Sequence, residues 1–180
     1  MPTYADVINF WFHEIDQAQH WKKDQGFDQL ITDRFGKLHH QAALCELFDW
    51  RTSAKGRLAE IIVLDQFSRN MYRDTPLSFA YDPQALTLAQ EAVALKVDVE
   101  LNSLERSFLY MPYMHSESLK VHEVAVELFT RNGIENNLDF EIRHKKIIEQ
   151  FGRYPHRNAI LGRNSTPEEI EFLKQPDSSF

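Results

Sequence analysis

The segment formed by residues 151–163 concentrates side chains that could bind an anion. It holds three arginines and a histidine but no acid, in a chain whose formal net charge is −7. A guanidinium matches a carboxylate or phosphate through two parallel hydrogen bonds. The anion-binding candidates in the segment are Arg153, Arg157, Asn158 and Arg163. The alternative is that these arginines neutralise the protein's own acids, such as Asp65 and Glu117, because a buried carboxylate needs such partners.

The tripeptide His115-Ser116-Glu117 is a second group that could carry chemistry. An imidazole titrates near neutral pH, so His115 or His156 could act as a general acid or base, with Glu117 orienting the ring. The competing interpretation places His115 in an exposed loop and Glu117 in the first turn of a helix, where a negative charge is favourable. A His-x-Glu pair has too few ligands for a metal unless His144 or His156 joins it. We predict no bound metal and no cofactor.

A third polar group lies at residues 65–73. Asp65 and Arg69 are one helical turn apart, and Arg73 continues the same face. On an exposed helix such a pair contributes only about 0.3–0.5 kcal/mol. The preceding turns are strongly apolar, however, so this polar end could emerge at the mouth of a cavity, where Asp65 could fix the tautomer of a histidine. The ligand-binding candidates outside the first segment are Asp65, Arg69, Asn70, Arg73 and, for an apolar wall, Trp11 and Tyr110.

Other residues whose side chains could take part in chemistry have simpler interpretations. His144 lies beside Arg143 and Lys145, and a charge run on a helix is usually a solvated face. We extend the same expectation to His39 and His122. Cys45, the one cysteine, follows an apolar helical pattern and is expected in the core.

The composition excludes several classes of protein. The 27 acids outnumber the 20 lysines and arginines, which argues against nucleic-acid binding. No apolar run approaches the roughly 20 residues that cross a bilayer, and the N-terminus lacks a signal-peptide pattern. One cysteine permits no intrachain disulfide, which favours a reducing, cytoplasmic location. Phosphate loops, nucleophile elbows and zinc patterns are missing.

The periodicity of apolar residues predicts an all-α protein in which residues 1–180 form one compact domain of about eight helices. Capping residues, glycines and prolines set the expected boundaries. The predicted helices follow Thr3 and then span about 27–48, 53–67, 82–95, 103 to the proline at 112, 116–133, 138–151 and 167–173. Residues 14–26 are expected to form a loop. Short connections favour antiparallel neighbours.

Several sequence blocks resemble the bacterial family known as domain of unknown function 924. The matching blocks are residues 10–12, 64–73, 108–112, 115–117, 151–158, 161–163 and 165–166. The block Gly-Arg-Tyr-Pro-His-Arg-Asn is specific, and the resemblance spans nearly the whole chain. It implies an all-α fold similar to tetratricopeptide-repeat domains and no established activity. The chain departs from the family pattern at Ser68, where the family has proline, and at Met114 and Ser118, where acids are common.

Three functional hypotheses follow. The first is a site that binds, and could transform, a small anionic molecule held by Arg69, Arg153 and Arg157. The second is a tetratricopeptide-like module that binds a peptide or protein in an open groove. The third makes the polar residues a buried structural network, with every arginine and histidine paired. A nucleic-acid or membrane partner is not expected.

Overall fold

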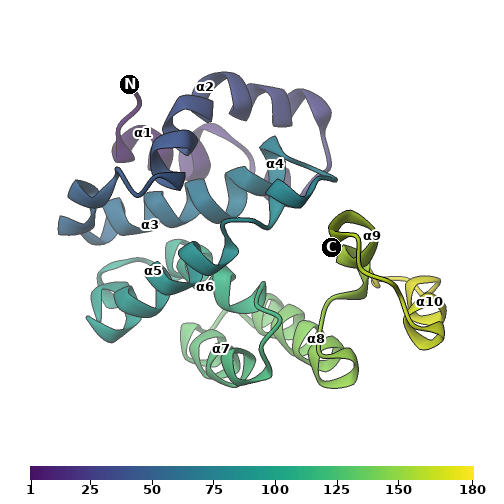
Figure 1. Ribbon diagram of the computed structural model, residues 1–180. Coiled ribbons are helices and arrows are strands. Elements are labelled where there is room, and N and C mark those ends of the chain that lie inside the picture. Colours follow the sequence, from purple (N-terminus) through teal and green to yellow (C-terminus); the bar gives the residue numbers. More distant parts are fainter.

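The computed structural model describes residues 1–180, and its regular secondary structure is entirely helical (Figure 1). The all-α prediction is therefore confirmed. The α-helices are α1 (Tyr4–Asn9), α2 (Gln25–Ala43), α3 (Ala54–Ile62), α4 (Ser68–Met71), α5 (Asp82–Ala94), α6 (Ser103–Met114), α7 (Leu119–Asn132), α8 (Glu135–Phe151), α9 (Asn158–Leu161) and α10 (Pro167–Leu173). No helix combines the length and the apolar character that crossing a membrane requires.

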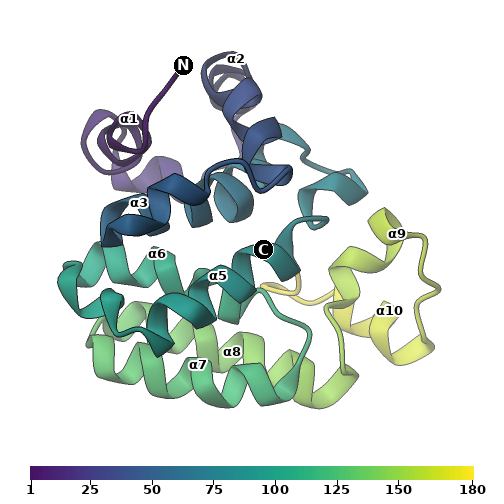
Figure 2. The same cartoon turned by 60° about the vertical axis from the view of Figure 1, so that its left-hand side comes forward.

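The helices pack in chain order. Helices α1 to α4 form one part of the molecule, where α1 packs on α3 and α2 packs on α4 (Figure 1). Helix α6 contacts α5 and α7, and α7 then packs along α8 (Figure 2). The connection between α7 and α8 is only residues 133–134, so these two helices run back along each other. Helices α9 and α10 form a separate corner beside the end of α8.

The apolar core joins the first seven α-helices. One cluster of 32 buried hydrophobic residues extends from Val7 in α1 to Phe129 in α7. A second, small cluster comprises Ile147, Ile148 and Tyr154, with Phe151 and Phe172 packed against it. This second cluster anchors the segment 151–163 to α8. The short α9–α10 corner therefore rests on few apolar contacts and relies on polar ones, which are described below.

Several helix boundaries agree with the capping signals in the sequence. Thr3, Asn102 and Thr166 each cap a helix through a complete capping box. Such a box satisfies backbone N–H groups that would otherwise lack a partner. Gly133 and Gly152 adopt left-handed conformations at the ends of α7 and α8, with φ of 78° and 69°. These positions favour glycine, because a Cβ atom disfavours that conformation.

The prediction that Pro112 ends its helix is wrong. Helix α6 continues through Pro112 to Met114, and every residue from Ser107 to Met114 is buried. A proline inside a helix removes one backbone hydrogen bond. Packing on all sides of this segment outweighs that loss.

Other boundary predictions also need correction. The predicted loop at 14–26 contains a 3₁₀ turn, Gln17–Trp21, and α2 begins at Gln25. Helix α2 ends at Ala43, well before the predicted residue 48, because the chain turns at Cys45 with φ of 61°. Cys45 is consequently exposed and not part of the core. Helices α7 and α8 begin at Leu119 and Glu135, a few residues from the predicted starts.

Candidate functional site

The centre of the site is a carboxylate–imidazole pair formed by two predicted residues. Asp65 lies in η4 (Val63–Phe67), a π-helical turn that continues α3, and His115 follows the last residue of α6. Asp65 Oδ1 is 2.7 Å from His115 Nδ1, and Gln66 Nε2 donates to Asp65 Oδ2 at 2.7 Å. Because a carboxylate only accepts hydrogen bonds, Asp65 holds the proton of a neutral His115 on Nδ1. Single π-helical turns often occur at functional sites.

The other nitrogen of His115 is free to react. The one hydrogen bond of the ring is made by Nδ1, and the His115 side chain keeps 12% of its surface exposed. Burial lowers the pKa of His115, and the Arg69 charge lowers it further, while Asp65 offsets part of the shift. Burial alone would raise the pKa of Asp65, but His115 and Arg69 outweigh it and hold that pKa at about 2. At pH 7 the pair is therefore a carboxylate beside a neutral imidazole.

Arg69 and Arg157 flank this pair, and their environments differ. Arg69 forms two hydrogen bonds with Asp82, at 2.8 and 2.9 Å, and a third with Asp65 at 3.2 Å. Arg157 donates from Nη2 to the carbonyl oxygen of His115 at 2.9 Å, and its nearest carboxylate, Asp82, is 3.7 Å from Nη1. Its Nε is buried without a partner. Arg157 is therefore the arginine of the site whose charge is least compensated.

Two aromatic rings hold Arg157 in place. Its guanidinium carbon lies 4.5 Å from the centroid of the Phe79 ring and 4.7 Å from that of Tyr154. The side chain is only 6% exposed. Burial, followed by the repulsion of Arg69, lowers the pKa of Arg157. The attraction of an anion beside it would offset both effects.

The remaining arginines of the segment bind the protein's own acids. Arg163 makes paired hydrogen bonds with Glu117 at 2.8 and 2.9 Å, and Glu117 also accepts from the backbone N–H of Tyr154. Arg153 makes a similar pair with Glu169 at 2.8 and 3.0 Å. These contacts follow the alternative interpretation of the two arginines as charge partners of buried or half-buried carboxylates. The first pair ties the residues after α9 to the segment before α7, and the second ties α10 to the end of α8.

Three histidines expected on solvated faces are buried instead. His39 bonds to Ser68 Oγ at 2.7 Å, and His122 lies between Glu141 and the carbonyl oxygen of Ser116. His144 bonds through Nδ1 to the carbonyl oxygen of its own helix, at Phe140. The charged residues around them in sequence point outward, because helix neighbours in sequence lie on different faces. Burial lowers the pKa of His144 to about 3 and that of His39 to about 4.

His156, the other predicted histidine of the segment, lies beside Tyr154 and Arg157. Its Nδ1 is buried without a hydrogen-bond partner. Burial, with the nearby charges of Arg157 and Arg69, lowers its pKa to about 3. The ring is 4.4 Å from that of Phe180, measured between centroids.

The comparisons with known proteins place the chain in a family. The model of a family described as a bacterial protein of unknown function (DUF924) matches residues 7–177. The chain belongs to the DUF924 family. It is similar to a solved structure of a protein of unknown function, ATU0120, from Agrobacterium tumefaciens, with 37% sequence identity and a TM-score of 0.91. That match covers 95% of this chain and 96% of the other. The comparison with curated proteins found no match.

Four more of the predicted ligand-binding residues lie apart from the centre of the candidate site. Asn70 and Arg73 both bind Asp28 of α2, Asn70 at 2.8 Å and Arg73 through two bonds at 2.6 and 2.8 Å.

Tyr110 is fully buried, and its hydroxyl donates to Asp98. Asn158 joins the charge pairs, because its side chain bonds to both Glu169 and Arg163. No group of three or more metal-ligating side chains is close enough together to hold a metal ion.

The candidate site also contains residues that sequence patterns did not single out for function. Asp82, the first residue of α5, is the main partner of Arg69. Phe79 and Tyr154 enclose Arg157, and Phe180 lies against His156. Tyr154 lies within the basic segment 151–163, and this position is the one sequence feature that could have pointed to it. Phe79, Asp82 and Phe180 lie outside that segment and belong to no recognisable motif.

Proposed function

We propose that the site binds a small anionic molecule through Arg157 and that the Asp65–His115 pair transfers a proton to or from it. The observation that carries this proposal is the hydrogen bond of 2.7 Å between Asp65 and Nδ1 of His115, which leaves the opposite nitrogen, Nε2, without a partner in the chain. A general base needs an unprotonated nitrogen at working pH and a fixed orientation. The lowered pKa of His115 keeps its Nε2 unprotonated, and the hydrogen bond to Asp65 fixes the orientation of the ring.

The anion-binding part of the proposal depends mainly on Arg157. Arg153 and Arg163 already have carboxylate partners, and Arg69 has two. Arg157 has only a longer contact with a carboxylate, 3.7 Å from its Nη1 to Asp82, and keeps an unpartnered Nε. It also donates to the backbone carbonyl oxygen of His115, the residue that carries the proposed base. This contact links the proposed anion-binding residue to the proposed base.

A change at Arg157 tests the anion site. We expect inorganic phosphate and propionate to raise the unfolding midpoint of the wild type, because a ligand at one hundred times its Kd stabilises a fold by about 2.7 kcal/mol. Arg157→Gln should lose this shift, and Arg157→Lys should keep part of it. Arg34→Gln is the matched control, because Arg34 pairs with Glu14 far from the site. Equal stabilisation of Arg157→Gln and Arg34→Gln by both anions would rule out the proposed anion site.

The protonation of His115 tests the base. At pH 7 we expect nitrogen-15 NMR to show His115 neutral, with its proton on Nδ1. Exposed imidazoles in water favour the proton on Nε2, so the exposed residues His13 and His40 provide internal references. A charged His115 at pH 7, or one with its proton on Nε2, would exclude the role that we assign to it.

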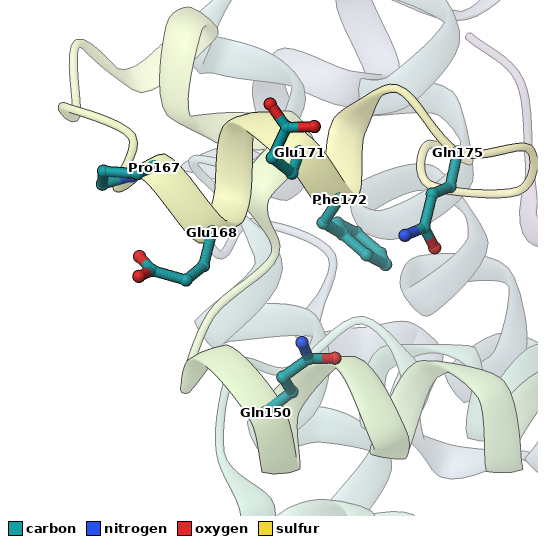
Figure 3. A pocket seen from close by; sticks show the side chains of 6 residues that line it. All are labelled: Gln150, Pro167, Glu168, Glu171, Phe172 and Gln175. Atoms are coloured by element: carbon teal, nitrogen blue, oxygen red, sulfur yellow. The ribbon is translucent and has the colours of Figure 1, made fainter.

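The peptide-binding alternative has weaker support. A groove of about 510 Å³ runs between the end of α8 and α10 (Figure 3). Phe172 points into it from α10, opposite Gln150 of α8, and the rest of the lining is Pro167, Glu168, Glu171 and Gln175. Peptide grooves depend on buried apolar or aromatic anchors. This groove offers one aromatic residue, so the geometry supports the small-molecule site better.

A further inference from the structure

An aromatic box next to the proposed site is filled by a residue of the same chain. The ring of Phe180 lies 3.9 Å from the ring of His144, 4.4 Å from that of His156 and 5.1 Å from that of Tyr154, measured between centroids. It meets the Tyr154 ring edge to face, at an interplanar angle of 86°. The three rings that surround Phe180 are the aromatic box. Such edge-to-face and tilted contacts favour an aromatic occupant over an aliphatic one.

Two of the three walls of the box are held by hydrogen bonds, whereas its occupant is not. Tyr154 is fully buried and donates its hydroxyl proton to the carbonyl oxygen of Met114, and His144 bonds to Phe140. Phe180 makes no hydrogen bond and keeps 46% of its surface exposed. The nearest tail anchor is Ser178, whose hydroxyl bonds to the carbonyl oxygen of Leu173. Ring contacts alone therefore hold the Phe180 side chain in the box.

The box lies beside uncompensated polar groups. The Arg157 guanidinium is 4.7 Å from the centroid of Tyr154, the same ring that forms one wall. His156, a second wall, has a buried Nδ1 without a partner. Both imidazoles are neutral at pH 7, because burial lowers the pKa of each to about 3. The uncharged aromatic box and the positively charged Arg157 thus both contact the Tyr154 ring.

We propose that the aromatic box binds the ring of a small aromatic anion whose acidic group reaches Arg157, and that Phe180 occupies the box when this ligand is absent. The inference rests on the proposed function, because it names the class of molecule that the anion site accepts. Phe180 then competes with the ligand for the aromatic box, as a part of the same chain. Its removal should increase the fraction of molecules with an open box, and apparent affinity rises in proportion to that fraction.

The test compares 3-phenylpropionate with propionate, which has the same carboxylate but no ring. We expect Phe180→Ala to bind 3-phenylpropionate about tenfold tighter than the wild type does, if about one molecule in ten has an open box in the wild type. Propionate should bind both proteins equally. Phe48→Ala is the matched control, because Phe48 is 61% exposed and lies in the Phe48–Thr52 turn before α3. Calorimetry measures the affinities, and Phe180→Ala should fold because it alters an exposed side chain.

The outcomes separate the two proposals. If 3-phenylpropionate binds Phe180→Ala no tighter than wild type, the box is not its site and the inference fails, while Arg157-dependent binding of propionate would leave the proposed function standing. If neither acid depends on Arg157, the proposed function fails. Ring-proton NMR signals of His144 and His156 should move on Phe180→Ala substitution and again on addition of 3-phenylpropionate. Unmoved signals in the second step would also overturn the inference.

Discussion

Unfolding free energy should fall steeply between pH 6.5 and pH 5, because the folded protein holds neutral histidines that the unfolded chain protonates. Burial lowers the pKa of His39 to about 4 and that of His144 to about 3, from 6.5. Below pH 6.5 the unfolded state takes up protons that the folded state does not, so stability decreases as pH falls. For each buried histidine the free energy of unfolding then falls by about 1.4 kcal/mol per pH unit, or about 2 kcal/mol in all at pH 5. Together His39 and His144 account for about 4 kcal/mol.

Adjacent residues provide the control for this prediction. His39 is 1% exposed, whereas His40 lies on the solvent side of the same helix turn. Urea unfolding at pH 6.5 and pH 5 should show that His39→Gln removes about 1.4 kcal/mol per pH unit from the slope, while His40→Gln leaves the slope unchanged. Two equal slopes would show that His39 is protonated in the fold.

Other groups do not disturb this comparison. The lowered pKa of Asp65 gives a contribution that is present above its unfolded value of 3.8 and is lost only at lower pH. Burial raises the pKa of Glu141, which makes stability change in the opposite direction. Both contributions are common to the two variants and cancel in the difference between them.

Features set by local chemistry could be predicted from the sequence. Thr3, Asn102 and Thr166 cap helices because their side chains accept from backbone groups three residues on, which neighbouring sequence alone determines. The same holds for Gly133 and Gly152, whose positive φ is available at little cost without a side chain. Pro112 is the exception, because the packing of α6 depends on helices distant in sequence.

Partners across the fold could not be predicted in the same way. The sequence suggested that Asp65 could orient a histidine and that the arginines could neutralise acids, but it did not say which residues meet. Asp65 forms a hydrogen bond with His115, fifty positions along the chain, and Arg69 forms one with Asp82 on the next α-helix. The burial of His122 and His144 was missed for a related reason. Charged residues next to a histidine in sequence lie on other faces of the helix, so they do not show whether the histidine itself is exposed. Whether its face is buried depends on which other helices pack against it.

A second large effect is expected at the corner where α3 begins. A Cβ atom added at Gly56 would lie 2.0 Å from the carbonyl oxygen of Trp50 and 2.9 Å from its carbonyl carbon. These are backbone atoms, so they cannot move aside as the end of a flexible side chain would. The corner also holds a buried pair, in which Arg51 donates twice to the fully buried Glu60 at 2.8 and 2.7 Å. We expect Gly56→Ala to lower the free energy of unfolding by about 4 kcal/mol.

Gly36 in α2 provides the matched comparison. A Cβ atom there would meet no other atom within 4 Å, and the residue lies inside a regular helix. Alanine is the better helix former, so Gly36→Ala should raise the unfolding free energy by about 0.5–1 kcal/mol. Urea unfolding of the two variants should therefore give shifts of opposite sign from the same chemical change. Equal shifts would mean that helix propensity governs both sites, and the close approach of the Trp50 carbonyl to Gly56 would then not exist in solution.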